Sequence, residues 1–447
     1  MKTYIWFFHL FFSALCLTPI RTYILHAQIQ NIEFYKNKFD KYLHLPHQLD
    51  NLVTFYKDKI TIKNKQGQEE LTIYKNEIPV ISQLLEAEPP ETIEKFFRTK
   101  KNNPLSQRTL DSLLISIEEV YSFNKKNHLP LSGIRIAIDA GHFANDLPTA
   151  KIEQRLLCLT YPHKNKKDTI KLIEGQLTYL TAVILADKLK EQGADILLTR
   201  KNIDHTAFGM SYNEWYKKRK NTVLDSLYTH NKLPKDKYEK LKTATPTSFF
   251  HLFFREYELM QRAHLINTFN PHLTIIIHYN VDEKNKPWKQ PTPHNYSICF
   301  IGGAFEDNDL EKWTNKIHFL RLLLTHQIEN SEKISQWTIQ HFEEKLNISP
   351  AQKNHAKYLN TVCIPTQKTG VFCRNLLLTR YILSPLVYGE SLCQDNETEC
   401  HLLSEKNYTY KNQKIPYRIY EVADAYFQSV MNYFQEILST QKPSSNK

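Results

Sequence analysis

Short apolar runs alternate with amphipathic helical stretches over residues 133–437. The runs are rich in Ile and Leu and are bounded by glycine, proline or polar residues, which is typical of strands buried in a sheet. The strands predicted from these runs are 134–138, 195–199, 273–277, 296–302 and 383–388. The helices predicted from the 3.6-residue periodicity are about 176–190, 311–328 and 422–437, with another around 262–267. This alternation predicts an α/β fold, a three-layer sandwich with a mainly parallel sheet flanked by helices.

The pattern before Gly133 differs and predicts a small mixed N-terminal domain. A hairpin is expected over 59–74, turning at Asn64-Lys-Gln-Gly67, and a helix from 110 to 121. No cluster of reactive side chains occurs there, so we expect residues 28–130 to form an accessory domain and 131–440 the main domain. Two polar stretches, at about 202–256 and 336–367, interrupt the main domain. We expect them to be insertions that either frame a substrate groove or decorate the surface.

Residues 1–27 have the pattern of a secretory signal peptide. Lys2 precedes an apolar run over 4–17, and Leu25-His-Ala27 offers a small-residue cleavage site before Gln28. The run is shorter than the ~20 residues that a membrane span needs, and no later stretch reaches that length. A retained anchor is the alternative. We expect an exported protein, periplasmic or secreted, with no stable membrane span after signal cleavage.

The charge balance narrows the choice of partner. The chain has 447 residues and a formal net charge of +11, and a basic surface favours polyanions such as wall polymer, lipid headgroups or nucleic acid. The basic residues are scattered and no nucleic-acid-binding motif is visible, so we expect no nucleic acid partner. The sequence identifies no protein regulator.

Six cysteines follow the predicted cleavage site. An even number in an exported protein permits disulfides, and Cys393 and Cys400 are close enough in sequence for a local bridge. The spacing matches no zinc-finger pattern. We expect either structural bridges or buried thiols.

Three residues stand where metal ligands are commonly found. His142 follows the first main strand, Glu174 precedes the first main helix, and His278 ends another strand. Sites in open α/β sheets form at the carboxyl ends of the strands. Two imidazoles and one carboxylate leave a fourth position of zinc open for water, which is the catalytic arrangement. The alternatives are that His142 and His278 are surface or core histidines with no metal, and that Glu174 is present because the helix macrodipole favours an acidic residue at a helix start.

Four sets of residues over about 133–434 are together a more specific signal than any one of them alone. The segments are Ile136-Ala-Ile-Asp-Ala-Gly-His142; Glu174 with Gly193-Ala-Asp-Ile-Leu-Leu-Thr-Arg200; Arg262-Ala-His-Leu-Ile-Asn267 with Ile275-Ile-Ile-His-Tyr-Asn280; and Gly370-Val-Phe-Cys-Arg374 with Pro385-Leu-Val-Tyr-Gly-Glu390. In this order they resemble the motifs of the zinc-dependent N-acetylmuramoyl-L-alanine amidase family. The resemblance implies Zn²⁺ at His142, Glu174 and His278, with Glu390 as the catalytic carboxylate.

The resemblance also implies a substrate, peptidoglycan, and a reaction, hydrolysis of the amide bond between N-acetylmuramic acid and L-alanine. The alternatives are a zinc peptidase that acts within stem peptides and a non-catalytic wall-binding protein. Arg374 is expected to contact a substrate carboxylate or phosphate, to orient Glu390, or to form a structural salt bridge. Asn280 is expected to hold a substrate amide or to cap its strand. Glu390 has the alternative of a surface glutamate in an acidic loop.

Two departures from the family pattern concern the fit of the substrate. The family usually has glycines after its first histidine, whereas Phe143 and Ala144 follow here. The residues around Glu390 read Tyr-Gly-Glu-Ser-Leu, which also differs from the usual motif. The proposed ligands and Glu390 are all present.

Overall fold

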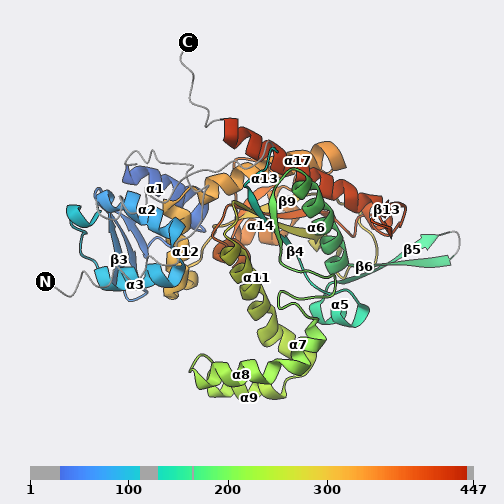
Figure 1. Ribbon diagram of the computed structural model, residues 1–447, viewed down its shortest axis with the longest axis horizontal. Coiled ribbons are helices and arrows are strands. Elements are labelled where there is room, and N and C mark those ends of the chain that lie inside the picture. Colours follow the sequence, from blue (N-terminus) through green and yellow to red (C-terminus); the bar gives the residue numbers. More distant parts are fainter. Residues whose placement is uncertain (1–30, 111–128, 164–165, 440–447) are drawn as a thin grey trace, which may run out of the picture.

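The computed structural model describes residues 31–110, 129–163 and 166–439 (Figure 1). The predicted signal peptide lies outside these residues, as does the predicted helix at 110–121 apart from its first residue. Within the described ranges, every helix is too short or too polar to span a lipid bilayer.

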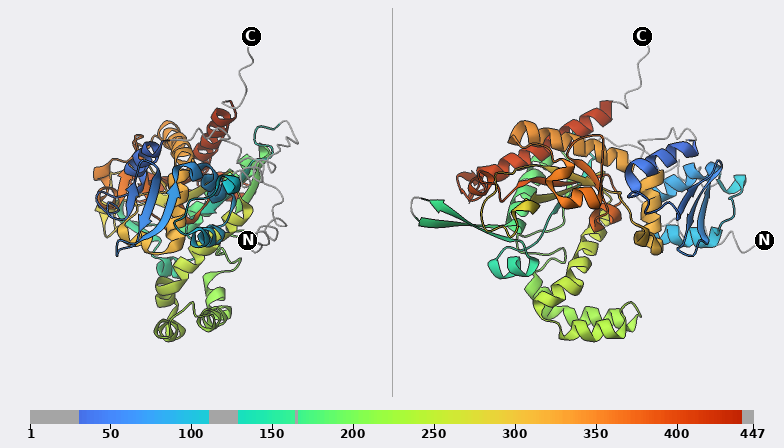
Figure 2. Two further views of the ribbon diagram at one scale, coloured as in Figure 1. Left: turned by 90° about the vertical axis from the view of Figure 1, so that its left-hand side faces the viewer. Right: turned by 180° about the vertical axis from the view of Figure 1, so that it is seen from behind.

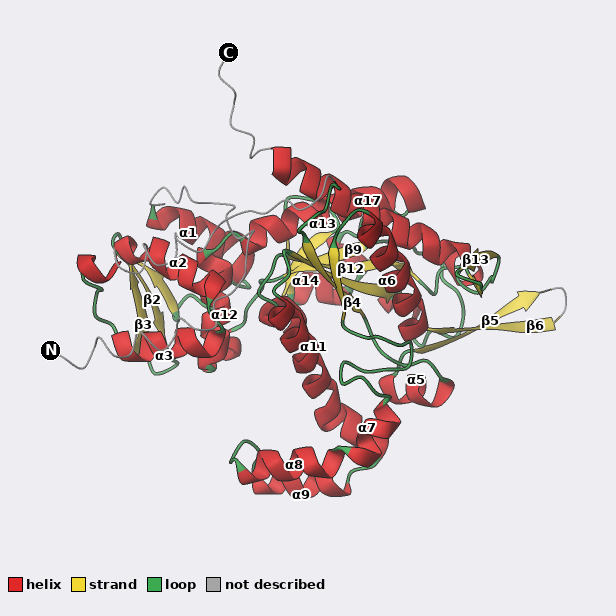
Figure 3. Ribbon diagram, in the orientation of Figure 1, coloured by secondary structure: helices red, strands yellow, loops and turns green. Residues whose placement is uncertain are grey.

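A seven-stranded sheet forms the centre of the main domain (Figure 3). In spatial order its strands are β10 (Cys363–Pro365), β11 (Val371–Arg374), β9 (Ile298–Ile301), β12 (Leu386–Cys393), β8 (Leu273–Asn280), β4 (Arg135–Ala140) and β7 (Asp195–Leu198). The pairs β11–β9, β12–β8, β8–β4 and β4–β7 are parallel, whereas β10–β11 and β9–β12 are antiparallel. The prediction of a mainly parallel sheet is confirmed.

Helices cover both faces of this sheet. On one face α6 (Glu174–Glu191), α13 (Gln327–Leu346) and α17 (Tyr417–Ser439) share a core with the strands. On the other face α11 (Arg255–Phe269) and α15 (Leu377–Tyr381) do the same. Neighbouring residues of β8 serve opposite faces, since Ile275 and Ile277 belong to the first core and Ile276 to the second. Strands buried on both faces read as continuous apolar runs, which is why the sequence made them visible.

The N-terminal region is a smaller α+β unit. Its antiparallel sheet consists of β1 (Val53–Phe55), β2 (Lys59–Lys63) and β3 (Glu69–Tyr74), and its helices are α1 (Ile32–Lys38), η3 (Phe39–Leu43), η4 (Lys75–Glu77), α2 (Ile78–Ala87) and α3 (Pro90–Lys100). The predicted hairpin is therefore present. Its turn is stabilised by Asn64, whose Oδ1 accepts hydrogen bonds from the backbone of Gln66 and Gln68, and by Gly67 at φ +80°.

Helix α12 (Trp313–Leu324) joins this unit to the main domain. It contacts α2 and α3 of the N-terminal unit and is preceded by the short helix η7 (Asp307–Glu311). Nε of Arg321 donates a 2.7 Å hydrogen bond to the carbonyl of Leu85, and the buried Lys38 forms a 2.8 Å ion pair with Glu329. The predicted single helix at 311–328 is thus two helices, because the chain turns at Thr325 before α13 begins.

The two segments predicted to be insertions are mostly helical. In the segment 336–367, helix α13 runs to Leu346 and buries an apolar stripe against the sheet, and η8 (Lys353–His355) and α14 (Lys357–Thr361) follow it. The segment 202–256, named the helical insertion after its predicted role, contains the short helices α7 (Tyr212–Lys218), α8 (Lys220–Thr229), α9 (Lys235–Thr243), α10 (Pro246–Phe249) and η5 (Phe250–Phe254). Figure 1 shows that α7, α8 and α9 project from the end of α11.

One further element lies between α5 (Leu147–Glu153) and α6 and has no counterpart in the sequence prediction. It is the hairpin of β5 (Leu156–His163) and β6 (Lys166–Ile173), which extends away from the sheet (Figure 2). Small additions near the C-terminus are α16 (Glu399–Leu402) and the β13–β14 hairpin (Tyr408–Tyr410, Gln413–Ile415). Strands β10, of three residues, and β11, of four residues, were also not predicted.

All six described cysteines are free thiols, five of them buried. The expected local bridge between Cys393 and Cys400 is absent: Sγ of Cys393 faces the carbonyl of Tyr296, and that of Cys400 faces the carbonyl of Glu397. Burial raises the pKa of both thiols, so they behave as small apolar core residues. The alternative of buried thiols describes the molecule better than that of bridges.

Candidate metal centre and active site

His142, Glu174 and His278 converge at the carboxyl ends of β4 and β8. Nδ1 of His278 lies 3.0 Å from Oε1 of Glu174, and Nε2 of His142 lies 3.4 Å from Oε2 of the same carboxylate. The two imidazole rings are perpendicular, with centroids 4.9 Å apart. Each of the three residues offers one ligand atom within 4.8 Å of the other two, so the group could hold a metal ion.

The backbone after β4 explains how the two histidines approach each other. A Cβ atom at Gly141 would lie 2.2–2.6 Å from ring atoms of His278, so only glycine leaves room for that ring. His142 follows with φ +56°, a left-handed conformation that turns its side chain back towards the sheet edge. The residues Gly141-His142 of the predicted motif therefore form a tight turn.

Glu153, at the end of α5, fixes the orientation of the His142 ring. Its Oε1 lies 3.0 Å from Nδ1 of His142, and its carboxylate also accepts hydrogen bonds from the backbone N–H groups of Phe143 and Ala144. Nε of Arg155 donates to Nε2 of His142, so the lone pair of the neutral ring is on Nε2, which faces Glu174, and Nδ1–H donates to the carboxylate of Glu153. The sequence analysis did not predict a role for Glu153, because no sequence pattern indicates that the end of α5 contacts His142.

The pKa shifts fit a site that favours neutral imidazole at His142. Burial lowers the pKa of His142 well below its usual value. Burial alone would raise the pKa of Glu174, but the two imidazoles beside it lower that pKa instead. Burial opposes protonation of His278 as well, yet the hydrogen bond that its Nδ1 donates to Glu174 raises its pKa. A deprotonated carboxylate and a neutral imidazole are the forms that bind divalent metals.

Two buried arginines support the backbone beneath the cluster. Nη1 of Arg262 donates to the carbonyl of Ala140 at 2.8 Å and forms an ion pair with Asp139 at 3.3 Å. Nη2 of Arg200 donates to the carbonyl of Gly175 at 3.1 Å, in the first turn of α6. Both arginines belong to the predicted motifs, and in the structure they position the segments that carry His142 and Glu174.

Glu390 lies beside His278. It stands in β12, paired in register with His278 of the parallel strand β8. Burial, together with the charge of Glu174, raises the pKa of Glu390 to about 7 against the opposing effect of His278. The ring of Tyr388, two residues earlier on the same face, stacks on His278 with centroids 4.6 Å apart. Glu390 is therefore part of the sheet at the cluster and does not belong to the acidic loop that follows it.

Arg374 and Asn280 lie on strands of the same sheet. The guanidinium of Arg374 lies over the rings of Tyr358 and Phe300, at 4.5 and 5.0 Å from their centroids. No carboxylate of the described residues lies within ion-pair distance of it, which argues against the salt-bridge alternative. Asn280 follows His278 by two residues and so shares its face of β8. Its Nδ2 is buried without a hydrogen-bond partner among the described residues, so its side chain does not cap the strand.

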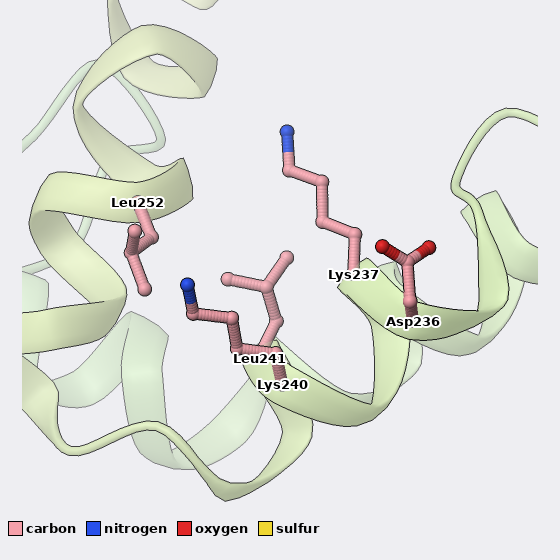
Figure 4. Close-up of a pocket in the computed structure, with 5 residues that line it drawn as sticks. All are labelled: Asp236, Lys237, Lys240, Leu241 and Leu252. Atoms are coloured by element: carbon pink, nitrogen blue, oxygen red, sulfur yellow. The ribbon is translucent and has the colours of Figure 1, made fainter.

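The helical insertion is anchored next to His142. Phe143 is buried in a separate small core formed by the insertion, with its ring 6.0 Å from those of Phe250 and Phe254 and 6.2 Å from that of Tyr212. The Phe after the first histidine of the predicted motif thus connects the His142–Glu174–His278 group to the helical insertion. A surface pocket of about 230 Å³ also lies on the insertion (Figure 4). Its lining residues are Asp236, Lys237, Lys240, Leu241 and Leu252, none of which belongs to the cluster.

Several solved structures of N-acetylmuramoyl-L-alanine amidases are similar to this chain. The amidase CwlD from Clostridioides difficile, solved in complex with the GerS lipoprotein, has 16% sequence identity and a TM-score of 0.36, and the match covers 68% of this chain and 99% of that one. An N-acetylmuramyl-L-alanine amidase from Mycobacterium smegmatis has 13% identity and a TM-score of 0.37 over the same shares. The catalytic domain of CwlV from Bacillus (Paenibacillus) polymyxa has 13% identity and a TM-score of 0.34, with 68% and 98% covered.

No protein-family model matches the chain, and no curated protein matches it either. The likeness to the solved structures is distant, so the chemistry of this protein has to follow from its own site.

Proposed function

We propose that this chain is a zinc-dependent peptidoglycan amidase that hydrolyses the amide bond between N-acetylmuramic acid and the L-alanine of the stem peptide. One observation carries the proposal: the His142–Glu174–His278 group lies beside Glu390 at one edge of the sheet, although four separate segments supply these residues. The order of these segments along the chain resembles that of the amidase motifs.

The donor set fits zinc. Two imidazole nitrogens and one carboxylate are typical of catalytic zinc sites, and Glu153 holds His142 in the tautomer that presents Nε2. Zinc held by His142, Glu174 and His278 would polarise the scissile carbonyl and lower the pKa of a bound water towards ~7.

Glu390 is proposed to move the protons of the reaction. As the water oxygen bonds to the carbonyl carbon, a proton passes from the water to Glu390, and the π electron pair moves onto the carbonyl oxygen. When that pair returns, the C–N bond breaks and Glu390 delivers its proton to the leaving nitrogen. A carboxyl group with a pKa of about 7 is suited to both transfers near neutral pH.

Asn280 and Arg374 are proposed to bind the substrate. The unpartnered Nδ2 of Asn280 can donate to a peptide carbonyl, and a buried donor gains most when the ligand supplies its acceptor. The guanidinium of Arg374 has no carboxylate partner in the described structure and can pair with a carboxylate of the stem peptide.

Residues 28–130 are proposed to be the accessory domain and 131–440 the catalytic domain of an exported enzyme. Peptidoglycan lies outside the cytoplasmic membrane, so the proposal requires the predicted signal peptide to function. Mass spectrometry of the mature protein should find an N-terminus near Gln28, and full-length protein recovered from the cytosol alone would contradict export.

Metal analysis and product analysis together test the proposed function. Purified protein should hold about one zinc per chain. Digested peptidoglycan should release intact stem peptides that begin with L-alanine, and free lactyl ends on the sugar. New termini inside the stem peptide would instead indicate the zinc peptidase, and a zinc-loaded protein that cleaves neither bond would indicate a wall-binding protein.

A further inference from the structure

Arg155 stands at the base of the β5–β6 hairpin, between α5 and the metal cluster. Gln154 ends α5 in a left-handed conformation with φ +57°. The backbone N–H of Arg155 then donates to the carbonyl of Ala150 at 2.8 Å, and its own carbonyl accepts from the N–H of Glu174 at 3.4 Å. The hairpin therefore brings Arg155 directly beside Glu174, although 18 other residues separate the two along the chain.

The guanidinium of Arg155 contacts the cluster. Its Nε donates a 2.8 Å hydrogen bond to Nε2 of His142 and lies 3.5 Å from Oε2 of Glu174. The side chain of Arg155 is 46% exposed, whereas that of Glu174 is 6% exposed. Arg155 thus approaches the ligand group from the solvent side, which is the side from which a polymer substrate must arrive.

The hydrogen bonds of His142 restrict what Arg155 can do when a metal is present. Nδ1 of His142 is committed to Glu153, so Nε2 holds the only lone pair of the ring. A metal ligated by His142 takes that lone pair, and the N–H of Arg155 must then find another acceptor. Its other hydrogen bond, from Nη1 to the carbonyl of Gln154 at 3.1 Å, keeps the guanidinium at the mouth of the site.

We infer that Arg155 is a further catalytic residue, which donates a hydrogen bond to the carbonyl oxygen of the scissile amide. The inference rests on the proposed amidase function. As the water oxygen bonds to the carbonyl carbon, the π electron pair becomes negative charge on the carbonyl oxygen, and a fixed cationic donor stabilises that charge more than it stabilises the neutral carbonyl. Arg155 takes no part in the proton transfers, which pass through Glu390.

The test compares Arg155→Ala and Arg155→Lys with the wild type and with Lys151→Ala, which removes an exposed positive charge from the same segment. Three quantities are measured: zinc affinity by chelator competition, melting temperature, and kcat and KM on a soluble muramoyl-peptide. Arg155→Ala should lower kcat by ~10²–10³ with little change in KM. Its zinc affinity should equal or exceed that of the wild type, because a cation and a competing donor are removed. Arg155→Lys should recover part of kcat, and Lys151→Ala should resemble the wild type.

Other results would overturn the inference. Loss of zinc together with activity in Arg155→Ala would mean that Arg155 only supports the ligand group. A higher KM with unchanged kcat would mean that it binds a substrate carboxylate in the ground state. If Arg155→Ala melts early, Arg155→Lys decides: wild-type kcat in a stable lysine variant would contradict the need for a guanidinium at this position. A zinc-loaded wild type that cleaves no muramoyl amide removes the proposed function itself, whereas an active wild type with an equally active Arg155→Ala removes only this inference.

Discussion

Nδ1 of His142 donates to the buried carboxylate of Glu153 at 3.0 Å, and this one contact decides which nitrogen of the ring faces the cluster. The same carboxylate accepts from the backbone of the two residues after His142, so it also holds the turn in place. The orientation of the first proposed ligand therefore comes from α5, an element that carries none of the family motifs.

Replacing Glu153 by glutamine should weaken zinc binding. The amide can no longer accept hydrogen bonds on both sides, and the ring of His142 loses its fixed tautomer, so zinc affinity should fall about 10–100-fold. Chelator competition measures this change. Glu343→Gln, at an exposed position of α13, is the matched control and should bind zinc like the wild type. Equal affinity in both variants would contradict the role of Glu153.

Glu390→Gln should separate chemistry from metal binding. Glutamine has nearly the same size and cannot carry the proton, so kcat should fall by ~10²–10⁴ while zinc and fold are kept. Glu174→Gln should instead lose zinc affinity together with activity, because a neutral amide is a weaker ligand. Both variants are compared by zinc stoichiometry and by release of stem peptides. A normal rate in Glu390→Gln would show that another group moves the proton.

Phe143→Ala should loosen the helical insertion. Truncating a buried aromatic side chain costs about 3–5 kcal/mol, and Phe143 packs against rings from α7 and η5. Denaturant unfolding measures the loss, and limited proteolysis should cut faster within 202–256. Leu252→Ala, on the same insertion but 41% exposed, should change stability by less than about 0.5 kcal/mol. Equal stability of the two variants would mean that Phe143 does not anchor the insertion.

Deleting residues 1–110 should leave a poorly soluble protein. Ten residues of α12 are buried, and the deletion removes α2 and α3, which contact α12, together with Phe39, whose ring lies 6.1 Å from that of Phe319, so apolar surface of α12 would be exposed to water. Glu329 would also lose its partner Lys38. Expression yield, light scattering and melting temperature measure the effect. A monomeric truncated protein with the wild-type melting temperature would mean that the rest of the chain folds independently of residues 1–110.

The sequence by itself determined the class of fold and the identity of the proposed ligands. Strands such as β4 and β8 are buried on both faces, so their apolar runs are visible locally. A residue that follows such a run, as His142 follows β4, must lie at the carboxyl edge of a parallel sheet. Glu174 lies beside His142 as the first residue of α6. His278 was expected at the end of its strand and lies two residues before it, because β8 extends to Asn280.

Only the tertiary structure decided what surrounds the ligands. The order of strands places β12 next to β8, and therefore Glu390 next to His278, but pairing between distant strands leaves no local pattern in the sequence. Glu153 and Arg155 reach His142 because α5 and the hairpin fold back over the sheet edge. In the sequence, Phe143 is only a departure from the glycines of the family motif. In the structure, it packs in the core of the helical insertion. Hydrophobic periodicity indicates whether a residue is buried. Which residues pack against it is determined only by contacts between segments that are distant in the sequence.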